Sequence, residues 1–370
     1  MGVLDRYLIR TVVLGGLGST AAFALLIVVF GAIDELSRTG GNYGFWQALA
    51  FVVLTMPGYL YDFYPVAILV GGLLALGGLA AHSELTVMRT AGMSMMRLAR
   101  PVLVAGVILA LLGMLMGETV GAWGQEKAKQ MRAQLQDQGV SMNLKSGLWM
   151  RDGHRFINVR QALVGGRLNE VRVFTLNAQG LPESMMFAQY ATSEGGDRWR
   201  LHQVEQTRLL PSATGGQVVT QSQAELSDVP LFSQAVLRVA VLNPHHMNIV
   251  ELLRYVRYLN ANHLDATNYL SALWGRIFAP VSVLVMLFIT LPFVFAPQRG
   301  GGAGRWLFIG ILLGVVYLTL VQILSAFAPV YGAGRAWVSF FSASLPPMLF
   351  AGLGYWAMRR WMPGLFARGR

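Results

Sequence analysis

His245 and His246 are the side chains of this sequence whose type and spacing come closest to those of a metal site. They follow Pro244 in a segment that we expect to lead from a β-domain back to the helices. No acidic residue or further histidine stands at ligand spacing from them, and a metal ion requires several convergent ligands. We therefore interpret the two histidines as a surface pair and predict no metal site.

The sequence also lacks the residue patterns of the common catalytic centres. It contains no Cys, which excludes disulfides, thiolate ligands and cysteine nucleophiles. It contains no Gly-x-x-x-x-Gly-Lys-Ser/Thr phosphate loop, so the chain cannot bind ATP in the Walker manner. The Ser and Asp residues of the β-domain form no nucleophile motif. We predict no catalytic residue and expect a protein that moves a substrate without reacting with it.

Composition indicates that lipid surrounds much of the chain. Of its 370 residues, 54% are apolar and only 13% are charged, whereas about a quarter of the residues of soluble domains are charged. A formal charge of +11 could indicate a nucleic-acid binder, but the basic residues are almost all Arg, and many of them flank apolar segments. This placement is typical of membrane topology.

Six uncharged windows are long enough to cross a bilayer, whose hydrocarbon core takes about 20 residues of helix. The first window is too long for the apolar part of a signal peptide, and no convincing cleavage pattern follows it. The predicted helices cover residues 11–33, 63–81, 101–117, 277–295, 306–327 and 336–358.

Residues 39–83 are long enough for two crossings, which would give seven helices. Arginine content decides between six and seven, because short cytoplasmic loops collect Lys and Arg. Six helices with a cytoplasmic N-terminus leave only Arg38 and Arg335 in the short outer loops, whereas seven would move three more arginines outside. We therefore predict six helices and interpret residues 45–61, which contain Pro57, as an interfacial or bent lead-in to the second.

The hydrophobic pattern of the sequence changes after the third predicted helix, from long apolar windows to short apolar runs. Residues 118–137 are polar and helix-prone, and short apolar runs then alternate with turn signals. The turn signals are Asp152-Gly153, Gly165-Gly166, Gly195-Gly196 and Gly215-Gly216. We expect a polytopic α-helical membrane protein with an inserted β-domain, a sandwich or jellyroll, that lies outside the cytoplasm by parity. The expected divisions are residues 1–138 with three helices, 139–247 with the β-domain and 248–370 with three helices.

The centres of the predicted helices carry no Asp, Glu, Lys or Arg. Because intramembrane charges mark ion and proton pathways, a proton- or sodium-coupled carrier is disfavoured. An apolar cavity or lateral groove for lipid tails is favoured instead. Gly71, Gly72, Gly77 and Gly78 permit close helix packing.

The loop between the second and third helices contains the most distinctive cytoplasmic segment, residues 83–93. Ser83 can begin a short helix there and Gly92 can end it. Leu85 and Met88 share one face, which could dock into a groove of another protein; a helix that rests on the lipid headgroups is the alternative. The residues that we predict to couple this segment to a partner are Glu84, Leu85, Met88, Arg89 and Gly92.

Four stretches of the sequence resemble the LptF/LptG family of lipopolysaccharide export permeases, and the resemblance extends over essentially the whole chain. They are GVLDRYLIRT at 2–11, LYDFYPVAILVGGLLALGGLAAHSELTVMRTAGMS at 60–94, GLWMRDGHRFINV at 147–159 and WGRIFAPVSVLVM at 274–286. The first and third stretches are similar to the LptG branch of the family.

This resemblance implies a multi-pass permease of the bacterial inner membrane, with six helices and a periplasmic β-jellyroll. It would pair with the permease LptF, be joined by LptC, and sit on two copies of the ATPase LptB. LptB would bind the ATP and magnesium, so this chain would need no cofactor, and residues 83–93 would be the coupling helix. Lipopolysaccharide would enter from the outer leaflet and leave towards a periplasmic bridge.

The lipopolysaccharide head carries phosphates, so cations are expected at the outer rim of the cavity, above apolar residues. Arg38, Lys129 and Arg132 match cationic positions of the family. The chain departs from the family near the outer end of the first helix, where Asp34 and Glu35 stand and more positive charge is usual. Solvated flanking charges are the alternative interpretation of the three cations.

Two other classes of function remain open on the residues alone. One is a stand-alone secondary carrier or channel, and the other is a signalling or scaffold protein whose β-domain senses a ligand. Co-purification with an ATPase, followed by a test of lipopolysaccharide-stimulated hydrolysis, distinguishes the three.

Overall fold

The computed structural model describes most of the chain. The described residues are 2–37, 39, 43–135, 148–152, 154–163, 167–177, 179–195, 197–210, 217–232, 244, 247–262, 264–295, 303–331 and 335–361. Arg38, His245 and His246 lie outside them, as does the side chain of Lys129.

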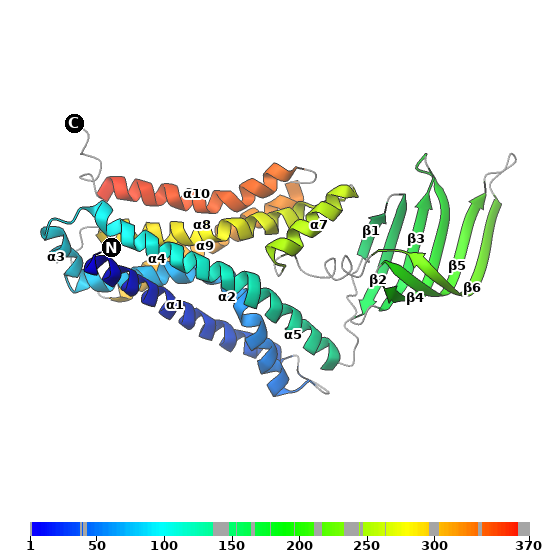
Figure 1. Ribbon diagram of the computed structural model, residues 1–370, viewed down its shortest axis with the longest axis horizontal. Helices are drawn as coiled ribbons and strands as arrows, with labels where there is room; N and C mark the ends of the chain where they lie inside the picture. Colours follow the sequence, from blue (N-terminus) through cyan, green and yellow to red (C-terminus); the bar gives the residue numbers. More distant parts are fainter. Residues whose placement is uncertain are drawn as a thin grey trace.

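The helices form a bundle, and a β-sheet that lies between its two halves in the sequence stands beyond one end of it in space (Figure 1). The first half contains α1 (Val3–Leu36), α2 (Phe45–Ala81), α3 (Glu84–Thr90), α4 (Met95–Leu115), the π-helical turn η1 (Met116–Gly121) and α5 (Ala122–Leu135). The second half contains α7 (Ile249–Ala261), α8 (Thr267–Phe295), α9 (Ala303–Tyr331) and α10 (Ala336–Trp361).

Six helical segments of the described residues are long and apolar enough to cross a membrane. They are Val3–Leu36, Phe45–Ala81, Arg97–Arg132, Thr267–Val294, Leu307–Ala328 and Ala336–Arg360. These segments contain or overlap the six predicted helices, three before the β-sheet and three after it. The predicted fold class, a polytopic helical protein with an inserted β-domain, is confirmed.

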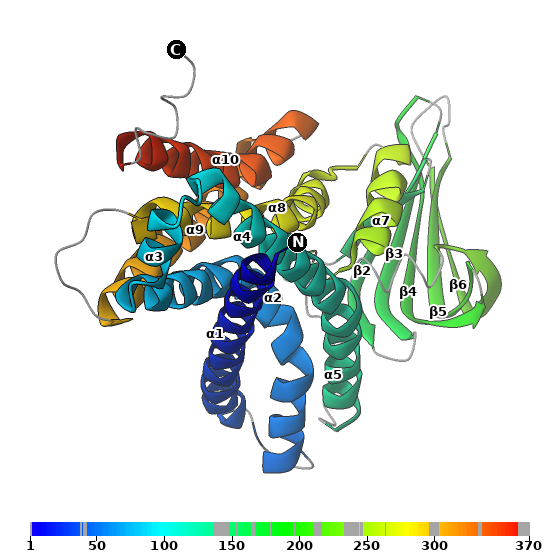
Figure 2. The same ribbon diagram turned by 60° about the vertical axis from the view of Figure 1, so that its left-hand side comes forward.

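The predicted lead-in at residues 45–61 is part of the second helix itself. It continues into the predicted span without a break, although Pro57 and Pro65 lie inside the helix. Figure 2 shows α2 changing direction between its first part, which runs beside α1, and its second part within the bundle. Proline removes a helical hydrogen bond and commonly kinks a helix. With 37 residues, α2 is about 55 Å long, more than the roughly 30 Å of hydrocarbon requires.

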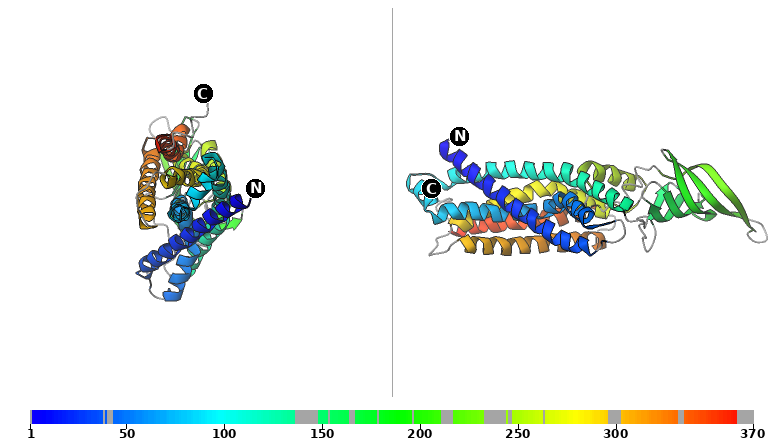
Figure 3. Two further views of the ribbon diagram at one scale, coloured as in Figure 1. Left: turned by 90° about the vertical axis from the view of Figure 1, so that its left-hand side faces the viewer. Right: turned by 90° about the horizontal axis from the view of Figure 1, so that it is seen from below.

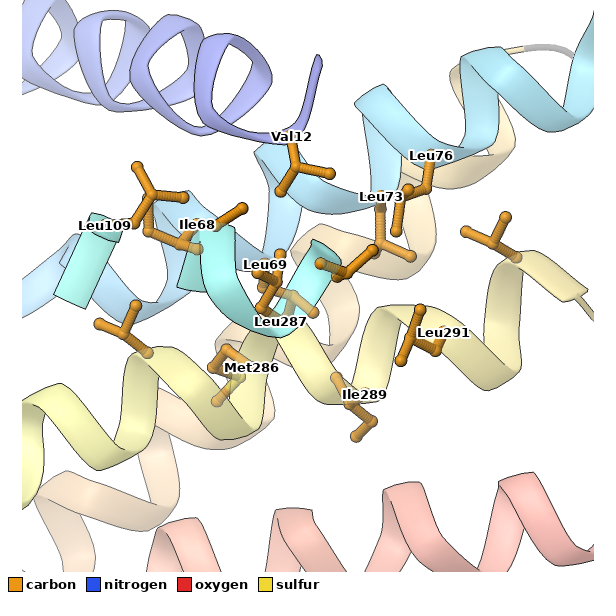
Figure 4. Packing of buried hydrophobic residues seen from close by; sticks show 14 of the residues in the cluster. Val12, Ile68, Leu69, Leu73, Leu76, Leu109, Met286, Leu287, Ile289 and Leu291 are labelled. Carbon is orange, nitrogen blue, oxygen red and sulfur yellow. The ribbon is translucent and has the colours of Figure 1, made fainter. Parts of the chain in front are cut away.

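The second part of α2 is the centre of the bundle. Its side chains Ile68, Leu69 and Leu73 are fully buried against Leu109 of α4 and Leu287 of α8 (Figure 4). In contrast, most of the apolar residues on α1, α9 and α10 remain uncovered by this chain. Those faces are available to lipid or to another protein.

Glycine lets α1 cross α2 closely. A Cβ atom added to Gly71 would lie 2.5 Å from the carbonyl oxygen of Gly15, which is backbone and cannot swing aside. A Cβ atom added to Gly72 would lie 2.6 Å from Cδ1 of Leu287 on α8, the end of a side chain. Gly78, in contrast, faces open space. The prediction of close packing therefore holds for Gly71 and Gly72 and not for Gly78.

The inserted domain is one six-stranded antiparallel sheet whose strands follow the order of the sequence. The strands are β1 (Leu148–Asp152), β2 (Arg155–Leu163), β3 (Arg167–Leu176), β4 (Pro182–Gly195), β5 (Arg198–Leu210) and β6 (Gln217–Pro230). Every predicted turn falls at a boundary between consecutive strands. Trp199 is fully buried on one face, where its indole Nε1 donates a hydrogen bond to the Phe232 carbonyl oxygen at 2.8 Å.

The order of the strands differs from that of a jellyroll. A jellyroll closes two sheets over each other through long connections, whereas the described strands form a single meander in which each strand pairs with the next one in the sequence. The short glycine-containing connections explain this topology, because they can only join neighbouring strands. No second sheet is present among the residues that the structure describes.

The sheet lies beyond one end of the helix bundle (Figure 3). The opposite end carries α3, the beginning of α1 and the last turn of α10 (Figure 1). Both described ends of the chain are therefore on the side away from the sheet. The boundaries predicted at residues 138 and 247 stay a prediction.

We expect the substitution Gly71→Ala to destabilise the bundle, because its methyl group would force α1 away from α2. Overpacking of this kind costs about 1–3 kcal/mol. Thermal unfolding of the purified protein in lipid nanodiscs should show a lower Tm, whereas the matched variant Gly78→Ala should unfold at the temperature of the parent. Equal melting temperatures for the two variants would contradict the close crossing.

Candidate functional site

The end of the bundle away from the sheet carries the predicted coupling segment, which forms the short helix α3. It begins after Ser83 and is followed by Gly92, whose φ of +85° suits glycine. The helix lies where the sequence placed it, with the predicted start and end.

Leu85 and Met88 share one face of α3 as predicted, but this face packs into the chain's own core. Leu85 is 3% exposed and Met88 is 7% exposed, and both belong to the main apolar cluster of the bundle. Val87 and Arg89 are exposed instead, Val87 at 63%. A partner that meets α3 would therefore contact Val87 before it could reach Leu85 or Met88.

Glu84 also has a partner within the chain. The hydroxyl group of Tyr7 on α1 donates a hydrogen bond to its Oε2 atom at 2.8 Å. This contact joins the first turns of α1 to α3, so a force applied to α3 would reach the first helix directly. The coupling role of these residues stays a prediction.

At the end of the bundle near the sheet, Arg132 of α5 forms a buried ion pair with Glu35 of α1. Glu35 is 4% exposed, and its Oε1 atom also accepts a hydrogen bond from the Tyr43 hydroxyl group at 2.7 Å. The Arg132 guanidinium lies 3.8 Å from the centre of the Phe51 ring, an attractive cation–π distance. Four segments of the chain thus meet at one cation.

Tyr43 remains a hydrogen-bond donor in this cluster at any ordinary pH. Burial, together with the neighbouring Glu35 carboxylate, raises the pKa of Tyr43 to about 12. The carboxylate of Glu35 therefore has two stable donors, the Tyr43 hydroxyl group and the Arg132 guanidinium. We call Glu35, Tyr43, Phe51 and Arg132 the rim cluster.

Of the three cations predicted to bind lipopolysaccharide, the structure describes the side chain of Arg132 alone; Arg38 and the Lys129 side chain lie outside the described part. The sequence did not reveal that Glu35 pairs with Arg132, because 97 positions separate them. Their opposite charges at the same predicted outer level were the available signal.

Below the rim cluster, α1 and α2 enclose a groove of about 440 Å³. Its walls are mainly apolar, and Asp34 and Glu35 lie at one end. The apolar lining residues are Phe23, Leu26, Ile27, Phe30, Phe51, Val52 and Phe63. An apolar groove beneath charged groups can hold an amphipathic molecule with its tail inside and its head at the rim.

A second buried ion pair joins the third span to the second half of the bundle. Arg276 Nη1 of α8 lies 2.7 Å from Glu118 Oε1 of η1, and Glu118 Oε2 accepts a hydrogen bond from the backbone N–H of Ile249. Together with Asp62, these charges stand one residue beyond the predicted spans 63–81, 101–117 and 277–295. They lie at the outer ends of those spans, so the predicted absence of charge holds for the predicted helix centres.

No group of three or more His, Cys, Asp or Glu residues suited to a metal occurs among the described residues. His245 and His246 fall outside them, so their interpretation as a surface pair stays a prediction.

Comparison with known proteins identifies the family to which this arrangement belongs. A family model described as "Lipopolysaccharide export system permease LptF/LptG" matches residues 6–360. The chain belongs to the LptF/LptG family. The resemblance seen in its sequence is therefore confirmed, and the chain is a multi-pass permease of this family.

Within the LptF/LptG family, the chain is similar to proteins named LptG. It is 30% identical to the lipopolysaccharide export system permease protein LptG of Haemophilus influenzae, over 97% of this chain and 99% of that protein. It is 31% identical to the LptG protein of Escherichia coli K12, over 97% of this chain and 98% of that protein.

We expect the substitution Glu35→Gln to loosen the outer end of α1, because it removes the charge that holds Arg132. The natural absence of Cys permits spin labels on cysteines introduced at the exposed positions Ile33 and Trp123. The distance distribution between the labels, measured by pulsed electron resonance, should become broader in Glu35→Gln. In the control Glu126→Gln, on an exposed position of α5, it should stay as in the parent. An unchanged distribution in Glu35→Gln would show that the ion pair does not hold α1.

Proposed function

We propose that this chain is the LptG-type permease subunit of an ATP-driven exporter that extracts lipopolysaccharide from the bacterial inner membrane. The observation that carries the proposal is the match to the permease family over residues 6–360. The partners would be the permease LptF, the protein LptC and a dimer of the ATPase LptB. Lipopolysaccharide would pass to a bridge that leads towards the outer membrane.

The two ends of the bundle fit opposite tasks in this proposal. Arginines cluster near the end that carries α3, which supports a cytoplasmic position for this end and for both chain termini. The sheet at the other end would then be periplasmic. Because the sequence has no phosphate loop, the ATPase must be a separate chain that acts on the cytoplasmic end. This chain would not be catalytic, and ATP and magnesium would be bound by the ATPase.

The groove between α1 and α2 is suited to the substrate that we propose. Acyl chains would lie against Phe30 and Phe63, and a phosphate of the head would lie at the rim cluster. A guanidinium group forms strong hydrogen bonds with phosphate. Arg132 already holds Glu35, so a phosphate must replace this carboxylate as its partner. Glu35 would thus weaken binding at rest and favour release of the substrate.

The function can be tested with the chain co-expressed with LptF, LptB and LptC and reconstituted in nanodiscs. Lipopolysaccharide should stimulate ATP hydrolysis by the complex. Arg132→Glu should reduce crosslinking of lipopolysaccharide to the chain, because it reverses the charge that faces phosphate. A secondary carrier or a sensor would neither retain the ATPase on purification nor stimulate hydrolysis, and either result would rule out the exporter.

We predict that Val87→Asp detaches the ATPase and leaves the permease folded, because Val87 is exposed on α3 and a charge there would be buried in the partner's groove. Loss of such a contact costs on the order of several kcal/mol. The neighbouring exposed change Thr86→Ala should retain the ATPase. Leu85→Asp should lower the Tm of the permease itself, because Leu85 lies in its core. Retention of the ATPase by Val87→Asp would show that α3 rests on the membrane surface.

A further inference from the structure

The second half of the bundle contains a cavity that the proposed export path does not use. It has a volume of about 740 Å³ and lies between α2, α8, α9 and α10. The groove beneath the rim cluster, in contrast, lies between α1 and α2. A volume of this size is typical of sites for small organic molecules.

Asp62 places a carboxylate in the wall of this cavity. Its side chain is exposed there, and among the described residues it forms no hydrogen bond or ion pair. The nearby Arg276, which also lines the cavity, is paired with Glu118 at 2.7 Å and lies over the ring of Tyr61. Asp62, Glu118 and Arg276 together carry a net charge of −1. Because Arg276 is paired with Glu118, the uncompensated negative charge is that of Asp62.

The position of Asp62 along α2 places this charge at the level of lipid headgroups. Nineteen residues separate it from Ala81 at the other end of the helix, a rise of about 28 Å. This is close to the roughly 30 Å thickness of the hydrocarbon core. A molecule bound at Asp62 could thus keep its charged group at the outer membrane surface and its apolar part within the bundle.

The rest of the wall combines aromatic rings with an unused polar atom. Phe278 and Tyr317 contribute rings, which attract organic cations through their faces. Tyr61 is 8% exposed, and its hydroxyl group is buried without a hydrogen-bond partner among the described residues. The rings of Phe278 and Tyr317 make this wall suited to an organic cation.

We propose that this cavity binds an organic ammonium group attached to an apolar body, with Asp62 as the counter-ion. A carboxylate that faces apolar surroundings needs a compensating cation. The volume exceeds what a metal ion fills, and the described residues offer no cluster of metal ligands here. The same chemistry can be supplied by an amine-bearing membrane lipid or by a soluble alkylammonium compound.

The proposal can be tested with the full chain in nanodiscs of phosphatidylglycerol, which contain no amine. Radiolabelled dodecyltrimethylammonium should bind saturably, whereas dodecanol, which lacks the charge, should not compete for the site. Asp62→Asn should weaken this binding by about tenfold or more. Glu126→Gln, which removes an exposed carboxylate elsewhere, should bind as the parent does. Equal affinity in Asp62→Asn, or equal competition by dodecanol, would overturn the proposal.

A second variant keeps the test independent of any effect of Asp62 on folding. Gly275 lines the cavity, and a Cβ atom added to it would meet open space. Gly275→Leu should therefore fill part of the cavity, preserve the Tm and reduce dodecyltrimethylammonium binding; undiminished binding would count against the cavity as the site. Competition by phosphatidylethanolamine added to the nanodiscs would identify a lipid as the occupant, and its failure to compete would exclude this lipid and favour a soluble amine.

Discussion

The cost of placing charge in hydrocarbon governs where the ionisable side chains of this bundle lie. A charge in the bilayer centre costs several kcal/mol unless it is paired or hydrated. The Glu35–Arg132 and Glu118–Arg276 pairs obey this constraint, because each joins one carboxylate to one guanidinium and is therefore internally neutral. The second part of α2, from Phe63 to Ala81, contains no charged residue, so aliphatic side chains and glycine can pack it against α4 and α8.

Polar contacts between distant segments also occur at the two ends of the bundle. At one end α3 packs through Leu85 and Met88 into the core and is joined to α1 by the Tyr7–Glu84 hydrogen bond. At the other end the rim cluster joins α1 to α5 through Glu35 and Arg132. The first helix has a polar connection at both ends and a largely uncovered apolar face between them. It is therefore the element most directly able to transmit a movement of α3 to the rim.

The local features of the sequence predicted much of the fold. Uncharged windows revealed the six spans because the bilayer requires about 20 consecutive apolar residues of every helix that crosses it. Paired turn residues such as Gly165-Gly166 marked the strand boundaries, but no local signal distinguished a meander from a jellyroll. Pro57 suggested an interruption that the helix tolerates, because a proline kinks a helix without necessarily ending it.

The candidate site was harder to predict because it depends on contacts between distant segments. The spacing of Leu85 and Met88 correctly placed them on one face, but only the packed bundle shows that this face is already covered. Similarly, Arg132 could be identified as a cation near the outer rim, while its buried partner Glu35 on another helix could not. The spacing of apolar residues predicts which side chains share one face of a helix, but it does not predict which other element packs against that face.

The π-helical turn η1 sets the rotational phase of everything that follows it in the third span. A π-turn accommodates one residue more than an α-helical turn, and each residue of an α-helix advances by about 100°. Beyond η1, Gln125 and Ala128 are buried and Gln125 reaches the Thr55 carbonyl oxygen of α2. A third span shortened by one residue at Met116–Gly121 would turn this surface by more than a quarter of a circle and carry Arg132 away from Glu35. The number of residues in η1 therefore determines which side of α5 faces α1 and α2.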